Sequence, residues 1–331
     1  MSTASFPSLL QQFFTQRLIQ QLNVSSCTVA AYRDAFRLLF SFAETRLNKR
    51  PTELTLDDLN VPFVLAFLDY LEKERHNCVR SRNARFAAIR SFMSFVGTRE
   101  PSALASAQSV LAISMKRFER PLVGFLSRQL IEAILAAPDP DTWSGRRDRV
   151  MLATLYNTGA RVSEVTSMRV RDLQLQPSPA VHIHGKGRKQ RVVPLWRSTA
   201  AGLKSWLHES PRASDEPLFP NRAGGQLTRV GVSERLKLAT ATAAQQYPEL
   251  AKQRVSPHII RHSTAMHLLQ ADVSITVIAL WLGHESPTTT HGYVEADLKM
   301  KERALQSLQS PTTAPLRYRP NDDLLRFLQD L

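Results

Sequence analysis

The sequence predicts a mainly α-helical protein with two domains and one small β-hairpin. From the N-terminus to residue 118, successive segments carry apolar residues at helical spacing, which is typical of amphipathic helices. This pattern stops at the basic stretch MKRFERPLVGFL, where Pro and Gly interrupt the apolar stripe. Between residues 180 and 195 the period shortens, and the β-rich runs VHIH and QRVVPL flank a glycine-bearing loop, which indicates a hairpin.

A chain of 331 residues is long enough for two hydrophobic cores. We expect a helical domain at residues 1–118, a linker at 119–126 and a mixed α/β domain at 127–310. Residues 311–331 contain three prolines and end in a short helix with an apolar face. Such a short helix needs a partner surface, either on its own domain or on a neighbouring protomer.

The helices of the first domain are assigned from their apolar faces. They are expected at residues 6–22, 25–47, 57–74, 81–97 and 101–115. In the fourth helix, Phe86, Ile89 and Met93 form the buried stripe, and a row of arginines stays outside. These arginines are Arg80, Arg82, Arg85 and Arg90. A solvated charged face and contacts with phosphate groups explain each of them about equally well.

The second domain begins with a helix that Ser127 caps, and two further helices follow with a break at Gly159. Arg161 therefore stands at the start of a new helix. The hairpin loop presents three basic residues, Lys186, Arg188 and Lys189. Later helices are expected at residues 197–209, from about 228, and from Pro257, a residue that suits a helix start.

The composition favours a polyanionic partner. There are 43 Lys and Arg against 29 Asp and Glu, a formal net charge of +14, and nucleic acid is the commonest such partner. Cys27 and Cys78 form no CxxC pair, so neither a disulfide framework nor a zinc site is predicted. No apolar run is long enough to span a membrane, and the N-terminus lacks a secretory signal pattern, so we expect a cytoplasmic protein.

The segment 256–293 holds the most distinctive polar residues. His258 and Arg261 lie three residues apart, so they share a helix face near the positive helix N-terminus. An imidazole and a guanidinium in that position favour a phosphate ligand. His284 follows a Leu-Gly pair, and Tyr293 lies nine residues beyond it.

Each of these residues also has an ordinary explanation. Arg161 and Lys186 are solvated in most proteins with such patterns, and Tyr293 is equally suited to a buried position. His258 and His262 have the spacing of zinc ligands, but the residue after His258 is Ile and not the Glu of an HExxH site, so no metal is predicted. The residues gain weight from their joint order and spacing.

Cutting DNA without a metal requires residue types that all occur in this chain. Two arginines bind the non-bridging oxygens of a phosphate and stabilise the charge of its transition state. A tyrosine attacks the phosphorus and forms a covalent phosphodiester, which conserves the bond energy for rejoining. A lysine or a histidine protonates the departing oxygen.

With these motifs the sequence resembles the tyrosine recombinases, the family of the phage integrases and the bacterial Xer proteins. RDRVMLATLYNTGARVSEVTSMRVRDL resembles the first box of the family, GKGRKQRVVPL its β-hairpin, PHIIRHS its second box and LGHESPTTTHGY its third. The resemblance implies a set of catalytic residues: Arg161, Lys186, His258, Arg261, His284 and the nucleophile Tyr293, with Glu164 as a supporting acid. It also implies that the first domain is a core-binding domain and the second the catalytic domain.

The resemblance implies a site-specific recombinase that acts on double-stranded DNA through a 3′-phosphotyrosyl intermediate and a Holliday junction. A tetramer on two DNA sites is implied, sister recombinases are candidate partners, and no metal, ATP or other cofactor is needed. Candidate DNA contacts are Arg80, Arg82, Arg85, Arg188 and Lys189. The tail beyond residue 310 is longer than the Xer ending, which favours an integrase or transposase of a mobile element. The alternatives are a Xer-type chromosome or plasmid dimer resolvase, an inactive DNA-binding regulator and a type IB topoisomerase.

Overall fold

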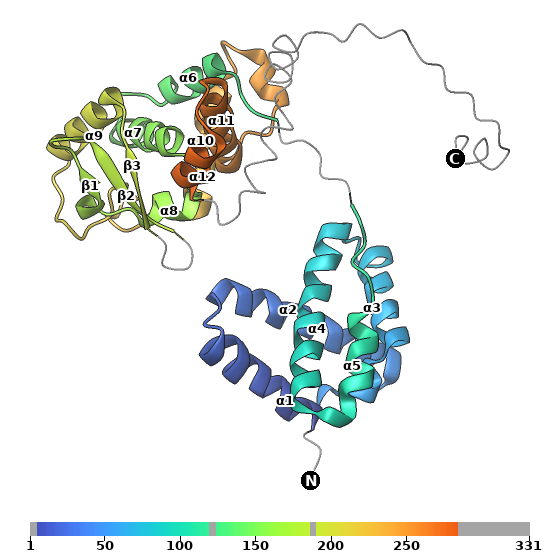
Figure 1. Ribbon diagram of the computed structural model, residues 1–331. Coiled ribbons are helices and arrows are strands. Elements are labelled where there is room, and N and C mark those ends of the chain that lie inside the picture. Colours follow the sequence, from blue (N-terminus) through green and yellow to red (C-terminus); the bar gives the residue numbers. More distant parts are fainter. Residues whose placement is uncertain (1–4, 119–123, 186–189, 284–331) are drawn as a thin grey trace, which may run out of the picture. The chain divides into compact units, whose positions relative to one another are not determined.

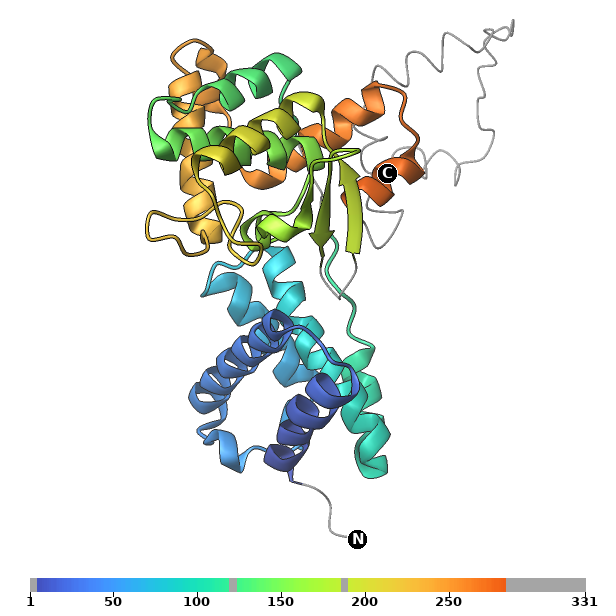
Figure 2. The same ribbon diagram turned by 90° about the vertical axis from the view of Figure 1, so that its left-hand side faces the viewer.

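The computed structural model describes residues 5–118, 124–185 and 190–283 (Figures 1 and 2). The chain divides into two compact units, Met1–Pro121 and Leu122–Leu331. Each unit has its own hydrophobic core. Within the described ranges, no helix is long and apolar enough to cross a membrane.

The first unit consists of helices packed around α4. Its elements are α1 (Phe6–Gln12), which continues as a π-helix over Phe13–Gln21, α2 (Ser26–Leu47), α3 (Val61–Lys73), α4 (Val79–Arg99) and α5 (Leu104–Leu111), with 3-10 turns at Pro51–Glu53, Asp57–Leu59 and Pro101–Ala103. α4 packs against α2, α3 and α5. The ring of Phe92 on α4 meets the rings of Phe6, Phe13 and Phe36 edge to face, so an aromatic cluster forms the centre of this core.

Two arginines that were predicted on the outside of α4 contact other parts of the unit, Arg82 buried and Arg90 half-buried, so this part of the prediction is wrong. Arg82 is 8% exposed, and its Nε lies 3.3 Å from the carboxylate of Glu72 on α3. Arg90 donates hydrogen bonds to the main-chain carbonyls of Leu111 and Ile113, where α5 ends. Because α4 is covered on several sides, its buried surface is wider than one apolar stripe, and long basic side chains pair with the Glu72 carboxylate and bind the main-chain carbonyls enclosed there.

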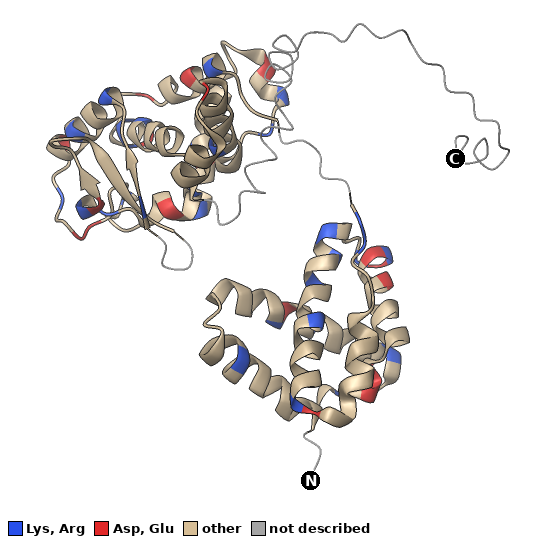
Figure 3. Ribbon diagram, viewed as in Figure 1, with Lys and Arg blue, Asp and Glu red and all other residues tan. Residues whose placement is uncertain are grey.

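The apolar stripe of α4 is confirmed, since Phe86, Ile89 and Met93 are fully buried. Of the other two arginines, Arg80 is exposed, whereas Arg85 is half-buried and donates a hydrogen bond to the carbonyl of Ser81. Figure 3 shows Lys and Arg on several helices of each unit, with Asp and Glu among them. A role of Arg80 and Arg85 in binding a polyanion stays a prediction.

The second unit is organised around α7. Its helices are α6 (Arg128–Ala136), α7 (Trp143–Thr158), α8 (Val162–Ser167), α9 (Arg197–Glu209), α10 (Arg229–Ala243), α11 (Pro257–Gln270) and α12 (Ile275–Leu282), with 3-10 turns at Val170–Asp172 and Pro248–Lys252. α7 packs against α6, α8, α9 and α11, and α12 packs on α11. Ser127 caps α6 by accepting a hydrogen bond from the main-chain N–H of Leu130, as predicted.

A small antiparallel sheet of three strands adjoins these helices, in the order β1 (Leu173–Gln174), β2 (Ala180–His184) and β3 (Gln190–Pro194). β2 and β3 form the predicted hairpin, with Val181 opposite Val193. Val181 and Val193 are buried, whereas the neighbouring residues His182 and Val192 are exposed, so the sheet covers the core with one face. β1 was not predicted, because two residues are too few to give a periodic signal.

Candidate active site

The turn between α7 and α8 places Arg161 at the start of α8. α7 ends at Gly159, whose φ of +57° lies in the left-handed region. A Cβ at this position would lie 2.5 Å from Cδ2 of Leu282, so glycine favours both the turn and its close approach to the end of α12. The break predicted at Gly159 is therefore confirmed, and Arg161 takes the N-cap position that Ser, Thr, Asp or Asn usually occupies.

Glu164 holds both the main chain and the side chain of Arg161. Its Oε2 accepts the main-chain N–H of Arg161 at 2.9 Å, and its Oε1 accepts Nη1 of the same arginine at 2.9 Å. The Glu164 side chain is 3% exposed, whereas the Arg161 side chain is 39% exposed. The carboxylate is thus an internal support, while the guanidinium that it holds is accessible to a ligand.

Arg261 joins the ends of two helices. It lies on α11, which starts at Pro257 as predicted and is capped by the Ser256 side chain. Its Nη1 donates to the carbonyl of Gly159 at 2.6 Å and its Nη2 to that of Leu282 at 2.8 Å. Arg261 is only 4% exposed, and its charge complements the partial negative charge of the two helix C-termini.

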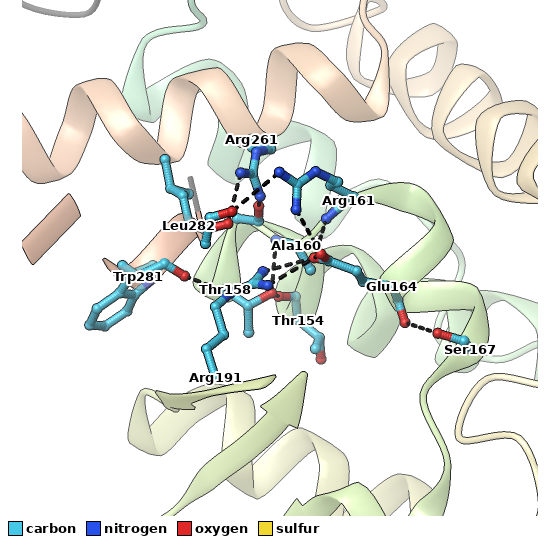
Figure 4. A network of polar contacts seen from close by, with 12 residues as sticks. Thr154, Thr158, Ala160, Arg161, Glu164, Ser167, Arg191, Arg261, Trp281 and Leu282 are labelled. Atoms are coloured by element: carbon cyan, nitrogen blue, oxygen red, sulfur yellow. Dashed lines mark hydrogen bonds and ion pairs between the residues drawn. The ribbon is translucent and has the colours of Figure 1, made fainter. Parts of the chain in front are cut away.

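The two arginines meet at the end of α12. Arg161 Nη2 donates to the carbonyl of Gly283 at 3.3 Å, next along the chain from the Leu282 carbonyl that Arg261 binds. Figure 4 shows the guanidinium groups of Arg161 and Arg261 directed toward this point from α8 and α11. Residues separated by 122 positions therefore converge. Two like charges this close favour an anionic ligand between or beside them.

A third arginine, Arg191, belongs to this cluster and was missed by sequence reasoning. Its Nη2 lies 2.8 Å from Glu164 Oε2, its Nη1 lies 3.2 Å from Oε1, and its Nε donates to the carbonyl of Trp281 at 2.8 Å. The alternation of side chains along β3 could have indicated that Arg191 points inward, because it lies on the same face of the strand as the buried Val193. Glu164 is thus bound by two guanidinium groups, those of Arg161 and Arg191.

The pKa of the Glu164 carboxyl reflects this setting. Burial alone would raise its pKa, but the hydrogen bonds and charges of Arg191 and Arg161 outweigh burial and bring the pKa below its usual value of 4.5. Glu164 is therefore ionised at neutral pH. Since one carboxylate pairs with two guanidinium groups and Arg261 adds a third positive charge at the end of α12, the cluster keeps excess positive charge for an anionic ligand.

Of the other predicted residues, the structure describes the histidines of α11 and not those of the hairpin loop or of the segment after Gly283. His258 lies one turn before Arg261 on α11 and is exposed, while His262 is 6% exposed. Five predicted residues lie outside the described part of the chain, namely Lys186, Arg188, Lys189, His284 and Tyr293. The terminal segment 311–331 also lies outside it. In the ranges that the structure describes, no group of three or more His, Cys, Asp and Glu side chains is arranged to hold a metal ion.

Comparison with known proteins covers both units. Residues 125–300 match the phage integrase family. The chain is 46% identical over 328 residues, 99% of each chain, to a Sinorhizobium fredii (strain NBRC 101917 / NGR234) protein named integrase/recombinase y4rC. It is 32% identical over 238 residues to the tyrosine recombinase XerC of Chlamydia trachomatis serovar L2, covering 70% of this chain and 71% of that one.

A solved structure extends the comparison to the fold. The XerH site-specific recombinase, bound to a palindromic difH substrate in a post-cleavage complex, matches with a TM-score of 0.68 at 20% identity. The match covers 86% of this chain and 81% of that chain. The predicted fold class, mainly helical with a small antiparallel sheet, is confirmed.

Proposed function

Because the chain belongs to the phage integrase family and is a site-specific tyrosine recombinase, we propose that Arg161 and Arg261 bind the DNA phosphate that Tyr293 attacks. The observation that carries this proposal is the convergence of the two guanidinium groups at the end of α12. Tyr293 follows Gly283 by ten residues in the sequence.

The proposed cleavage step exchanges one phosphodiester for another. The Tyr293 hydroxyl releases its proton to solvent as its oxygen attacks the phosphorus, the bond from phosphorus to the 5′-oxygen breaks, and a 3′-phosphotyrosyl link forms. Lys186 gives a proton to the departing 5′-oxygen, while His258 and His284 assist the two arginines at the phosphate oxygens. Rejoining is the reverse step with the 5′-hydroxyl of another strand. The covalent link stores the bond energy, so the proposal requires neither ATP nor a metal ion.

The support for Arg161 is electrostatic and geometric. A charge pair at about 4 Å and an effective dielectric constant of about 20 is worth ~4 kcal/mol, so two fixed guanidinium groups stabilise the doubly charged transition state substantially. Glu164 fixes Arg161 before any ligand binds, through one hydrogen bond to its main chain and one to its side chain. A donor that is already oriented loses little entropy when the phosphate arrives.

The substrate in this proposal is double-stranded DNA with a specific recombination site. Relatives in the comparison are named integrase, recombinase and XerC, and the solved XerH structure contains a difH substrate. We extend the proposal to four protomers on two sites, which exchange strands through a Holliday junction. We favour a mobile-element integrase over a dimer resolvase, because the relative at 46% identity is named integrase/recombinase, whereas the XerC relative is 32% identical.

The test starts by selecting binding sites for the full-length chain from a pool of random-sequence duplexes. Selected sites are then rebuilt as a panel of duplexes whose nick moves by one nucleotide, so that cleavage near the nick releases a short oligonucleotide and traps the covalent complex. We expect a trapped adduct with the wild-type chain. Tyr293→Phe should form none while binding the same duplex with unchanged affinity, because only the nucleophilic oxygen is removed.

An adduct that Tyr293→Phe forms as well as the wild-type chain would contradict the assignment of the nucleophile. The same reagents separate the alternatives. A type IB topoisomerase relaxes supercoiled plasmids that lack the selected site, whereas the proposed enzyme requires the site. An inactive regulator binds the site and forms no adduct on any duplex of the panel.

A further inference from the structure

Arg191 connects three parts of the second unit. It lies on β3, five residues beyond Lys186, in the strand that leaves the hairpin loop. Its two Nη atoms bind the two oxygens of Glu164 on α8, and its Nε binds the carbonyl of Trp281 near the end of α12. The side chain is 11% exposed, and a two-pronged contact of this kind fixes the orientation of the guanidinium.

The end of α12 is shaped to accept this side chain. Gly283 terminates α12 with a φ of +66°. A Cβ on Gly283 would lie 3.0 Å from Nη1, 3.2 Å from Cδ and 3.3 Å from Cζ of Arg191. The arginine therefore packs directly against the glycine backbone. Gly283 directly precedes His284 and the sequence that leads to Tyr293.

Arg191 also changes the charge balance around Arg161. Both arginines bind Glu164, but the Arg161 side chain is 39% exposed and the Arg191 side chain is 11% exposed. Arg191 therefore balances part of the negative charge of the buried Glu164 carboxylate. Without Arg191, Glu164 would have a single guanidinium partner and would draw Arg161 inward, away from an incoming phosphate.

We propose that Arg191 is a positioning residue for strand cleavage, which ties β3, Glu164 and the end of α12 together so that Arg161 and Gly283 are held in one geometry. This inference rests on the proposed function, because it concerns the step in which Tyr293 attacks. It assigns to Arg191 no contact with DNA.

The test compares Arg191→Met and Arg191→Lys with a matched control, Arg235→Met. Asp148 is a second buried carboxylate bound by two arginines, Arg147 and Arg235, so the control removes one of two guanidinium partners in the same unit. For each full-length variant, three quantities are measured on the selected nicked duplex and in solution: the single-turnover rate of adduct formation, the affinity for the duplex and the unfolding temperature.

We expect Arg191→Met to slow adduct formation about 100-fold, because a small misplacement of reacting groups has effects of that size. Its affinity for the duplex should stay within about threefold of the wild-type value, because no phosphate contact is lost. Arg191→Lys keeps the positive charge but lacks the planar guanidinium, so its rate should lie between those of Arg191→Met and the wild-type chain. Arg235→Met should lower the unfolding temperature and leave the rate unchanged.

A double-mutant cycle with Glu164→Gln tests whether Arg191 acts through Glu164. The double variant should react no more slowly than the slower single variant, whereas a product of the two losses would contradict the coupling. If Arg191→Met does not fold, Arg191→Lys decides, and a wild-type rate in either folded variant overturns the inference. No adduct with the wild-type chain would instead refute the proposed function, and this inference with it.

Discussion

Two buried carboxylates in the second unit are each bound by two arginines, but the exposure of those arginines differs. Asp148 on α7 is bound by Arg147, with Nη2 at 2.7 Å from Oδ1, and by Arg235. Glu164 on α8 is bound by Arg161 and Arg191. The carboxylate side chains are 2% and 3% exposed, so burial of the acid does not distinguish the two clusters.

The difference lies in the arginines. Arg147 is 4% exposed, donates Nη1 to the carbonyl of Pro220 at 2.9 Å and lies 5.2 Å from the ring centroid of Trp143. All sides of that guanidinium are used within the fold. The Arg161 side chain is 39% exposed, and its hydrogen bonds are directed to Glu164 and Gly283. An ion pair alone therefore does not mark a functional site, and of these two clusters the one at Glu164 keeps a guanidinium, that of Arg161, accessible to a ligand.

The largest effect on stability is expected when Asp148 is removed. Asp148→Ala leaves the buried Arg147 without its carboxylate, and the free energy of unfolding should fall by about 3–5 kcal/mol. Glu164→Ala should cost less, because Arg161 is accessible to water. Urea denaturation of both variants, compared at equal m-values, measures the two losses. A larger loss for Glu164→Ala would contradict the contrast between an enclosed cluster and an open one.

The next effect separates function from stability. Arg161→Ala should reduce the rate of adduct formation by about 10²–10³-fold, since it removes a preorganised donor to the transition state. Its free energy of unfolding should change by less than about 1 kcal/mol, because the ion pair is partly exposed. Arg147→Ala is the matched variant and should show the reverse pattern, with a marked loss of stability and a normal rate per folded molecule. If Arg161→Ala and Arg147→Ala changed the adduct rate and the free energy of unfolding equally, the contrast between the two clusters would be wrong.

A smaller effect is expected at the turn that connects the two clusters through α7. Gly159→Ala forces a Cβ into the left-handed region and toward Leu282, 2.5 Å away. The strain should lower the free energy of unfolding by about 1–3 kcal/mol and displace the carbonyl that Arg261 binds. The measurement is thermal unfolding together with the adduct rate. Gly202→Ala is the control, since its Cβ would meet Val150 at an ordinary 3.6 Å.

The smallest effect concerns pH. The folded-state pKa of Glu164 lies below the unfolded value of about 4.5, so ionised Glu164 adds stability that is complete above pH 4.5 and lost as pH falls toward the folded pKa. The stability difference between the wild-type chain and Glu164→Gln should thus be constant near neutral pH and shrink below pH 4.5. Urea denaturation across that range checks it, and a difference that grows on acidification would contradict the assigned direction.

Much of the fold was predictable because its signals are local. Ser127 marks a helix start by its side-chain cap and Gly159 a helix end by its left-handed backbone, and the helix expected at 197–209 is observed at those residues. The hairpin was predicted from the alternation around one loop. The prediction was wrong for Arg82 and Arg90, because their burial depends on α3 and α5, which a single helix pattern does not include.

The sequence by itself determined the family resemblance, the helical architecture and the two arginines Arg161 and Arg261, because spacing along a helix and order along the chain are properties of the sequence. Only the tertiary structure decided that the carbonyls of Leu282 and Gly283 bring these arginines together. It also decided that Arg191 on β3 is the second partner of Glu164. The physical reason is that such contacts join residues 21 to 122 positions apart, and their energies depend on burial and direction, which no local pattern specifies.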